Sequence, residues 1–351
     1  MILFDPGWLG SALRIVLVFT LVFGLFVNLL VYGERKVSAF MQDRIGPNRV
    51  GPFGVLQPIA DAIKFLFKEE VRPAGAHPIL YPLAPMIAVV PAVLVLAIIP
   101  LGARRIGGVL HPLQIADLDL GLLFALAISS LSVYGIIIGG WASNSKYPLL
   151  GTFRAAAQMI SYEIPQGMVI LSVFLLAGSA RLADIVAVQN HVWFVFLCPL
   201  GFLLFFISMF AETNRLPFDL PEGDSEIIGY HTEYSSMKFA SYFMAEYANM
   251  FTVSCLMALL FFGGWEFLPF FGWDRVGEWL GVDVYADPVL WLLPSVWFLL
   301  KVTLFLFVFI WVRWTLPRFR YDQLMRLGWK RLVPLSLLNL LLTVAVAWKA
   351  M

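Results

Sequence analysis

The chain has 351 residues, of which 60% are hydrophobic and 13% are charged, and its net charge is +1. Soluble domains are about 45–50% apolar and about 25% charged, so this composition indicates a protein that lies in lipid. The basic residues form no long run, which argues against nucleic-acid binding. The two cysteines lie in apolar runs, the four histidines are isolated, and the sequence has no nucleotide-binding or metal-binding motif. We therefore expect no metal and no redox cofactor to be bound by this chain alone.

Eight apolar runs follow one another along the chain. A helix needs about 20 apolar residues to cross the hydrocarbon core of a bilayer, where lipid offers no partner for unpaired backbone groups. No internal repeat divides the chain, so we predict one all-α integral membrane domain over residues 1–351; a soluble all-helical protein is the disfavoured alternative. The runs cover roughly residues 13–33, 79–101, 119–142, 155–178, 192–211, 238–263, 289–312 and 332–348.

Lysine and arginine are distributed unevenly between the two sides that these runs define. Seventeen of the 24 lie in or beside the connections that follow the first, third, fifth and seventh runs. Cytoplasmic connections carry such an excess, so this side is predicted to face the cytoplasm, or the matrix in a mitochondrion. Both termini are then on the periplasmic side. The first run has no convincing cleavage site and is interpreted as a retained helix.

The connection after the first run contains the sequence FGVLQPIADAIKFLFKEE, residues 53–70. Its apolar residues recur at helical spacing and its polar residues occupy another face, but it is too short to cross a bilayer. We predict an amphipathic helix at about residues 53–68 that lies along the membrane interface. A plain surface anchor would explain the pattern equally well.

Ionisable side chains inside membrane runs are costly and are therefore functional candidates. Glu163 and Glu246 each lie about eight residues, or roughly 12 Å, into a run from the cytoplasmic side, so they could face one internal cavity. Tyr242 and Asn249 share a helix face with Glu246. Lys301 lies near the middle of the seventh run. The alternative is that one of the glutamates pairs with Lys301 and only holds the bundle together.

The predicted cytoplasmic connection at residues 212–237 is unusually acidic. Its sequence AETNRLPFDLPEGDSEIIGYHTEY, residues 211–234, interleaves apolar residues with the acids, which indicates a loop that folds back onto the protein. Acids buried in this way need Arg215 or repel one another, and repulsion raises the pKa values of some of them. Such a series is typical of the proton relays of pumps. The six carboxylates are Glu212, Asp219, Glu222, Asp224, Glu226 and Glu233.

Four long motifs resemble the H-type membrane subunit of respiratory complex I, which mitochondria call subunit 1 of NADH:ubiquinone oxidoreductase. The resemblance extends over nearly the whole chain, and the motifs stand in the family's order. They are ERKVSAFMQDRIGPNRVGPFGVLQPIADAIKFLFKE (34–69), YPLLGTFRAAAQMISYE (147–163), the acidic sequence at 211–234, and PRFRYDQLMRLGWK (317–330).

The resemblance implies a fold of eight transmembrane helices plus one interfacial helix, without a redox centre. It implies a subunit that docks against the peripheral arm and helps to enclose a quinone chamber, with electrons supplied by an iron–sulfur cluster of a neighbouring subunit. Expected partners are the peripheral-arm iron–sulfur subunits at the cytoplasmic face, and small membrane and antiporter-like subunits laterally. Quinone is the expected substrate of the complex. The expected location is the bacterial inner (plasma) membrane or, alternatively, the mitochondrial inner membrane.

Site residues are carried over where this sequence matches the family's motifs. Many members read GESE where this chain reads GDSE, so Asp224 departs from the pattern but keeps the charge. An insertion at about residues 264–288 is assigned no function. Quinone binding is predicted for Arg35, Gln42, Arg44, Gly46, Pro47, Asp61, Ala62, Lys64 and Phe218. A proton pathway is predicted for Glu163, Glu212, Asp219, Glu222, Asp224, Glu226, Glu233 and Glu246, with Arg215 as a partner and Lys301 added for its place inside a run.

The sequence thus predicts a membrane subunit of a proton-pumping NADH:quinone oxidoreductase that is not catalytic alone. It would form part of the quinone chamber and the acidic funnel that couples quinone reduction to proton translocation. The main alternative is the related membrane subunit of an energy-converting hydrogenase, which shares the acidic loop but needs no quinone. The near-complete segment GPNRVGPFGVLQPIADAIK, residues 46–64, favours the quinone-linked branch. A carrier that works alone is a third possibility.

Overall fold

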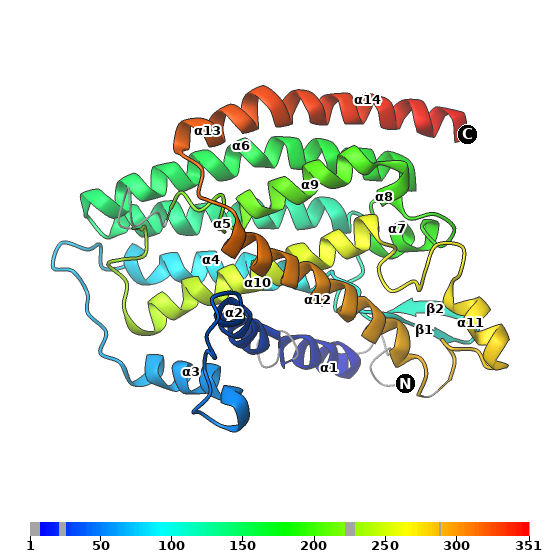
Figure 1. Ribbon diagram of the computed structural model, residues 1–351, viewed down its shortest axis with the longest axis horizontal. Coiled ribbons are helices and arrows are strands. Elements are labelled where there is room, and N and C mark those ends of the chain that lie inside the picture. The colour runs from blue at the N-terminus through cyan, green and yellow to red at the C-terminus, as the bar shows by residue number, and fades with distance from the viewer. Residues whose placement is uncertain (1–7, 21–25, 222–228, 288, 351) are drawn as a thin grey trace.

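The computed structural model describes residues 8–20, 26–221, 229–287 and 289–350, and most of these residues are helical. The long helices extend along the longest dimension of the molecule (Figure 1). Helix α1 (Trp8–Phe19) begins and α14 (Val333–Ala350) ends at the end that carries a small β-hairpin, whereas α3 (Gln57–Phe67) lies toward the opposite end. The described part of the chain is therefore a helical bundle with different structures at its two ends.

Each of the eight predicted apolar runs contains at least part of a helix. The first run holds most of α1 and the start of α2 (Val27–Met41), between which residues 21–25 lie outside the described part. The other seven contain or overlap α4 (Leu80–Leu96), α5 (Gly121–Ala142), α6 (Lys146–Ala177), α8 (Phe194–Leu197) with α9 (Pro199–Glu212), α10 (Ser236–Phe261), α12 (Leu292–Thr315) and α14.

Five helical stretches of the described residues are long and apolar enough to cross a membrane. They are α5, α6, α10, α12 and the stretch Tyr321–Trp348, which includes α13 (Tyr321–Leu327), a π-helical turn (Gly328–Leu332) and most of α14. Helices α4 and α9 are apolar but shorter. The structure therefore fits the predicted all-α membrane protein, while eight complete spans and the side on which the termini lie stay predictions.

Two helices extend beyond the apolar runs that predicted them. Helix α6 begins at Lys146 although its run begins at 155, and α2 continues to Met41 although its run ends at 33. Apolar composition marks the part of a helix that lies in lipid, whereas a helix ends only where its backbone hydrogen bonds end. At the other end, α6 stops where Gly178 adopts a left-handed conformation with φ of 69°.

Helix α10 lies at the centre of the bundle, in contact with α2, α3, α4, α7 (Leu182–Val188), α9 and α12. All twelve of its residues from Met250 to Phe261 are buried. Protein rather than lipid therefore surrounds this part of the helix. A polar side chain on α10, such as that of Glu246, therefore faces other helices rather than lipid.

Helices α4 and α5 approach each other closely. A Cβ atom added to Gly135 of α5 would lie 2.6 Å from the backbone nitrogen of Ala88 on α4. Small residues at a helix crossing allow such backbone contact in membrane proteins. This crossing forms one wall of the polar cavity described below.

The amphipathic helix predicted at about residues 53–68 is present as α3, which follows a short 3₁₀ turn (Pro52–Gly54). The sequence did not predict β1 (Ala103–Ile106) and β2 (Val109–Pro112), an antiparallel hairpin whose turn residues Gly107 and Gly108 both have positive φ. Two-residue hairpin turns favour this conformation, which glycine adopts readily.

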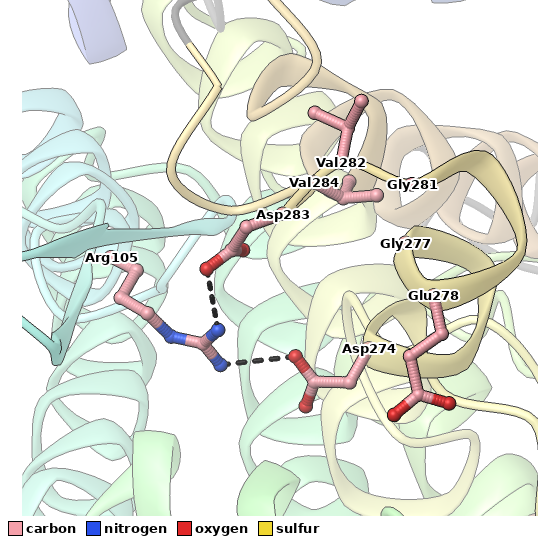
Figure 2. A pocket seen from close by; sticks show the side chains of 8 residues that line it. All are labelled: Arg105, Asp274, Gly277, Glu278, Gly281, Val282, Asp283 and Val284. Atoms are coloured by element: carbon pink, nitrogen blue, oxygen red, sulfur yellow. Dashed lines mark hydrogen bonds and ion pairs between the residues drawn. The ribbon is translucent and has the colours of Figure 1, made fainter.

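The insertion between α10 and α12 packs against this hairpin. Arg105 of β1 reaches between Asp274 on α11 (Trp273–Leu280) and Asp283, at nitrogen–oxygen distances of 3.0 and 2.7 Å (Figure 2). Its backbone N–H also donates to the carbonyl of Tyr285. Arg105, Asp274 and Asp283, with Glu278, line an open pocket of about 480 Å³. We call the hairpin and residues 264–287 the outer lobe.

Candidate functional site

A mostly apolar pocket of about 250 Å³ lies between α2, α3 and α10, and we call it the α3 pocket. Aromatic walls come from Phe65 of α3 and Phe243 of α10. Its charged members are Arg35 and Asp61, which form an ion pair at 2.5 Å. Ala62 also lines the pocket. The structure thus brings together Arg35, Asp61 and Ala62, for which quinone binding was predicted. Arg35 and Asp61 lie on different helices and are 26 positions apart in the sequence.

The other residues predicted to bind quinone lie outside the α3 pocket as the structure describes it. The turn after α2 packs onto that helix, because Lys36 donates a hydrogen bond to the carbonyl of Pro47 at 3.1 Å. Phe218 is buried between the rings of Tyr162 and Phe319. Their roles stay predictions. The six residues are Gln42, Arg44, Gly46, Pro47, Lys64 and Phe218.

Next to Arg35 in the sequence, Glu34 is buried inside the bundle and contacts three other elements. One carboxylate oxygen accepts a hydrogen bond from the Tyr247 hydroxyl at 2.5 Å. The other pairs with Arg313 and lies 3.7 Å from the Arg215 guanidinium. A second guanidinium nitrogen of Arg215 is 3.7 Å from the Glu246 carboxylate. We call this arrangement the Glu34–Arg215–Glu246 bridge.

The bridge is a network of opposite charges held largely out of water. The side chains of Arg215 and Glu34 are 7% and 8% exposed, so an unpaired charge at either position would be very costly. Both 3.7 Å contacts are longer than a hydrogen bond, and Arg215 also lies 4.5 Å over the Tyr247 ring. Among the described residues, Arg215 therefore lies between two carboxylates at distances beyond a hydrogen bond from each.

Beyond Glu246 lies a small cavity of about 20 Å³, which we call the acid cavity. Among the described residues, two carboxylates line it, Glu246 of α10 and Glu212 at the end of α9. The Tyr230 hydroxyl donates to Glu246 at 3.1 Å. Tyr242 and Asn249 also line this cavity, so the predicted shared face of α10 is confirmed.

The second carboxylate of the acid cavity is Glu212 rather than Glu163. Glu163 is half-buried on α6 and is not among the residues that line the cavity, although it lies within electrostatic range of Glu212. Gln166, one helical turn further along α6, donates a hydrogen bond to Glu212 at 2.8 Å. Helix α6 therefore presents an amide to Glu212 and places Glu163 nearby.

Lys301 has a different environment from the one that the sequence suggested. Its ammonium group donates to the carbonyls of Phe262, Gly264 and Glu266 at 2.7, 2.9 and 2.6 Å, just past the end of α10. These carbonyls lie about 24 Å along the helix axis from Glu246, so Lys301 does not pair with that glutamate. A proton-pathway role for Lys301 stays untested, and the geometry separates it from the acid cavity.

The described flanks of the acidic connection fold back onto the protein as predicted. Gln158 of α6 donates to the carbonyls of Ala211 and Phe218, both at 2.7 Å. Asp219 is buried and pairs with Arg318 at 2.7 Å. Glu233 is half-buried, and its backbone carbonyl accepts a hydrogen bond from a buried tyrosine of α4. Glu222, Asp224 and Glu226 lie outside the described residues.

Comparison with known proteins identifies the family of the chain. The model of the NADH dehydrogenase family matches residues 13–344. Three bacterial relatives are H-type subunits of NADH-quinone oxidoreductase. The chain is 52% identical over 334 residues to the second such protein of Geobacter sulfurreducens, and 51% identical over 332 residues to the first of Geobacter metallireducens; each alignment covers 94% of both chains. The first such protein of Cytophaga hutchinsonii is 49% identical over 315 residues, or 89% of both chains.

The chain belongs to the complex I family of H-type membrane subunits.

For this member of the family, sequence reasoning missed several residues of the site. The sequence pattern predicts no role for Glu34, which follows the first apolar run, or for Arg313, which lies in the basic flank after the seventh run. Both residues lie where a helix continues past its apolar run. The available signal was a charged residue on such an extension, close to another helix that also carries a charge. Tyr247 and Gln166 gave no signal, since single tyrosine and glutamine residues are common in helices.

Proposed function

We propose that this chain is the membrane subunit of a proton-pumping NADH:quinone oxidoreductase that links a quinone pocket to an internal proton pathway. Its relatives are named as H-type subunits of NADH-quinone oxidoreductase, which supports membership of that enzyme complex. The observation that carries the finer proposal is the Glu34–Arg215–Glu246 bridge. It connects α2 at the α3 pocket with α10 at the acid cavity.

The α3 pocket is suited to an oily electron acceptor. Its mostly apolar walls would accommodate an isoprenoid tail, and small-molecule sites are typically apolar with a few polar groups that fix orientation. Arg35 and Asp61 supply those polar groups at the pocket. Quinone reduction takes two electrons and two protons, and the electrons would come from an iron–sulfur subunit of the peripheral arm.

The bridge offers a way to transmit the change in charge that accompanies reduction. Glu34 and Arg35 are consecutive on α2 but point in different directions. A charge that appears or disappears in the α3 pocket would therefore act on Glu34 across the width of this helix, in a medium of low dielectric constant. Arg215 is shared between Glu34 and Glu246 at equal distances of 3.7 Å. If Glu34 gains or loses a proton, Arg215 is drawn toward one carboxylate or the other. The affinity of Glu246 for a proton then changes.

Protons would move from Glu246 through the acid cavity to Glu212, with Glu163 close by on α6. The acid cavity has space for about one water, which would join Glu246 to Glu212. Neighbouring membrane subunits would take the protons onward. The three relatives are bacterial, which supports a bacterial cell membrane for this chain. The excess of lysine and arginine supports an orientation in which the α3 end faces the cytoplasm.

The test is a pair of substitutions at Arg215 in the assembled complex. Arg215→Met should lower coupled quinone reductase activity and proton pumping by about tenfold or more, because it leaves two buried carboxylates with one cation fewer. Arg215→Lys should retain part of both, since it keeps the charge but not the planar group that reaches two partners. Arg181→Met, which removes an exposed ion pair with Asp117, is the matched control. Normal pumping by a fully assembled Arg215→Met complex would contradict the proposal.

A further inference from the structure

A second small cavity lies beside Glu212 on the side away from the acid cavity's tyrosines. It is lined by polar residues of four helices and by apolar residues around them, and its volume is about 20 Å³. It shares Glu212 and Asn249 with the acid cavity. The remaining polar members are Ser129 of α5, Gln166 of α6 and Thr252 of α10. We call it the Thr252 cavity.

Two buried polar atoms of this cavity have no hydrogen-bond partner among the residues that the structure describes. They are Oε1 of Gln166 and Oγ1 of Thr252. The two residues are 2% and 5% exposed, so bulk water does not solvate these atoms. A buried polar atom without a partner is costly, and native proteins commonly satisfy such atoms with ordered water.

The size of the Thr252 cavity and the chemistry of its lining match one water molecule. A cavity of roughly 10–15 Å³ is sufficient for one water, which needs two to four polar partners. The Gln166 oxygen accepts a hydrogen bond, and the Thr252 hydroxyl can donate or accept. Glu212 and Asn249 complete the polar lining. We propose that the Thr252 cavity binds one ordered water that hydrogen-bonds to Glu212, and that Thr252 is the residue that positions it.

This water would give Glu212 a partner in both of its protonation states. The Gln166 amide group that contacts Glu212 can only donate, so it cannot accept the proton that Glu212 carries in its protonated form. A water can donate to the ionised form and accept from the protonated form. The inference rests on the proposed function, in which Glu212 exchanges protons, and it adds a water site and a positioning residue to that pathway.

The experiment compares Thr252→Val and Thr252→Ser in the assembled complex, by electron cryomicroscopy at a resolution that shows ordered waters. Wild type and Thr252→Ser should show density for a water in contact with Gln166 and Glu212, and Thr252→Val should lack it because valine has the same shape without the hydroxyl. Proton transfer, measured as the pumping rate, should fall by about two- to tenfold in Thr252→Val, the value of one net hydrogen bond. The KM for quinone should not change.

Ser254→Ala is the control, because it removes another buried hydroxyl of α10, one that donates to the carbonyl of Met250. The water site is wrong if wild type shows no water density there, and the role of Thr252 is wrong if Thr252→Val keeps the water or pumps normally. Glu212→Gln separates this inference from the proposed function. Normal pumping by Glu212→Gln would overturn both. Reduced pumping by Glu212→Gln, together with a failed result at Thr252, would overturn only the water site.

Discussion

Two regions of this molecule bury charged side chains, and they hold them in different ways. At the edge of the outer lobe, Lys301 of α12 donates to three carbonyl oxygens at 2.6 to 2.9 Å, and within the lobe the Tyr285 hydroxyl donates to Glu266 at 2.6 Å. In the Glu34–Arg215–Glu246 bridge, one guanidinium lies 3.7 Å from each of two carboxylates. The first arrangement fixes each group with short hydrogen bonds, whereas in the second Arg215 faces both of these carboxylates from beyond hydrogen-bond distance. We infer that the first is structural and that the second can respond to a change in charge.

The comparison is tested most strongly at Lys301. Lys301→Met should destabilise the assembled complex by about 3–5 kcal/mol, since three buried carbonyls lose their donor. Thermal unfolding and the amount of incorporated subunit measure the effect. The complex that does assemble should pump a normal number of protons per electron. A Lys301→Met complex of normal stability with impaired pumping would instead place Lys301 in the proton pathway, as the sequence first suggested.

Glu163 tests whether the pathway extends beyond the carboxylates of the acid cavity. Glu163→Gln keeps the size of the side chain and removes its proton exchange, so proton pumping and coupled quinone reductase activity should fall by about tenfold or more. Pumping in reconstituted vesicles is the measurement. Glu278→Gln in the outer lobe is the control for loss of a carboxylate. If Glu163→Gln is fully incorporated and pumps normally, the pathway does not include this residue.

Ala62 tests the α3 pocket without touching any charge. Ala62→Thr places a larger and polar side chain in the pocket wall, so the apparent KM for long-tail quinones should rise by about three- to tenfold. Steady-state kinetics with long-tail quinones measure this change. Ala60→Thr, on the same helix but outside the residues that line the pocket, is the matched variant. An unchanged KM in Ala62→Thr would remove the pocket from the quinone route.

The smallest expected effect is a pH dependence in the outer lobe. Burial raises the pKa of the Glu266 carboxyl, although the hydrogen bond from Tyr285 opposes the shift. A raised pKa stabilises the folded protein below the unfolded pKa of about 4.3, and this stability is lost as the pH rises through the folded value. The free energy of unfolding should therefore fall less steeply with rising pH in Glu266→Gln than in wild type. The difference between the two slopes should be less than about 1.4 kcal/mol per pH unit. Unfolding temperatures of wild type and Glu266→Gln across that range provide the check; parallel curves would show that Glu266 does not titrate there.

The helices could be located from the sequence because lipid imposes one requirement on every span. About 20 apolar residues in a row must satisfy their own backbone hydrogen bonds, and α5, α10 and α12 lie within two or three residues of the predicted runs. The hairpin was missed because its strands are only four residues each and do not belong to an apolar run long enough to cross lipid. The Gly107–Gly108 pair between them was the usable signal.

The site was predictable where depth in the membrane made a charge conspicuous, as at Glu246. It was not predictable where the partner came from a distant segment. Glu34 and Arg313 are separated by 279 positions, and no local pattern shows that they meet. For the same reason, the sequence did not predict that Glu212 rather than Glu163 lines the acid cavity. Depth along a helix follows from counting residues, whereas the direction in which a side chain points around the helix depends on neighbours that only the fold supplies.

Helix α10 contributes to the α3 pocket, the bridge and the acid cavity, and the carbonyls just past its end are held by Lys301. Neighbouring helices surround it along most of its length. Sliding or rotating this helix on each catalytic cycle would break the lysine contacts at its far end and disturb close packing throughout. A signal that starts at the α3 pocket is therefore better carried by protons and a single guanidinium than by displacement of the helix itself.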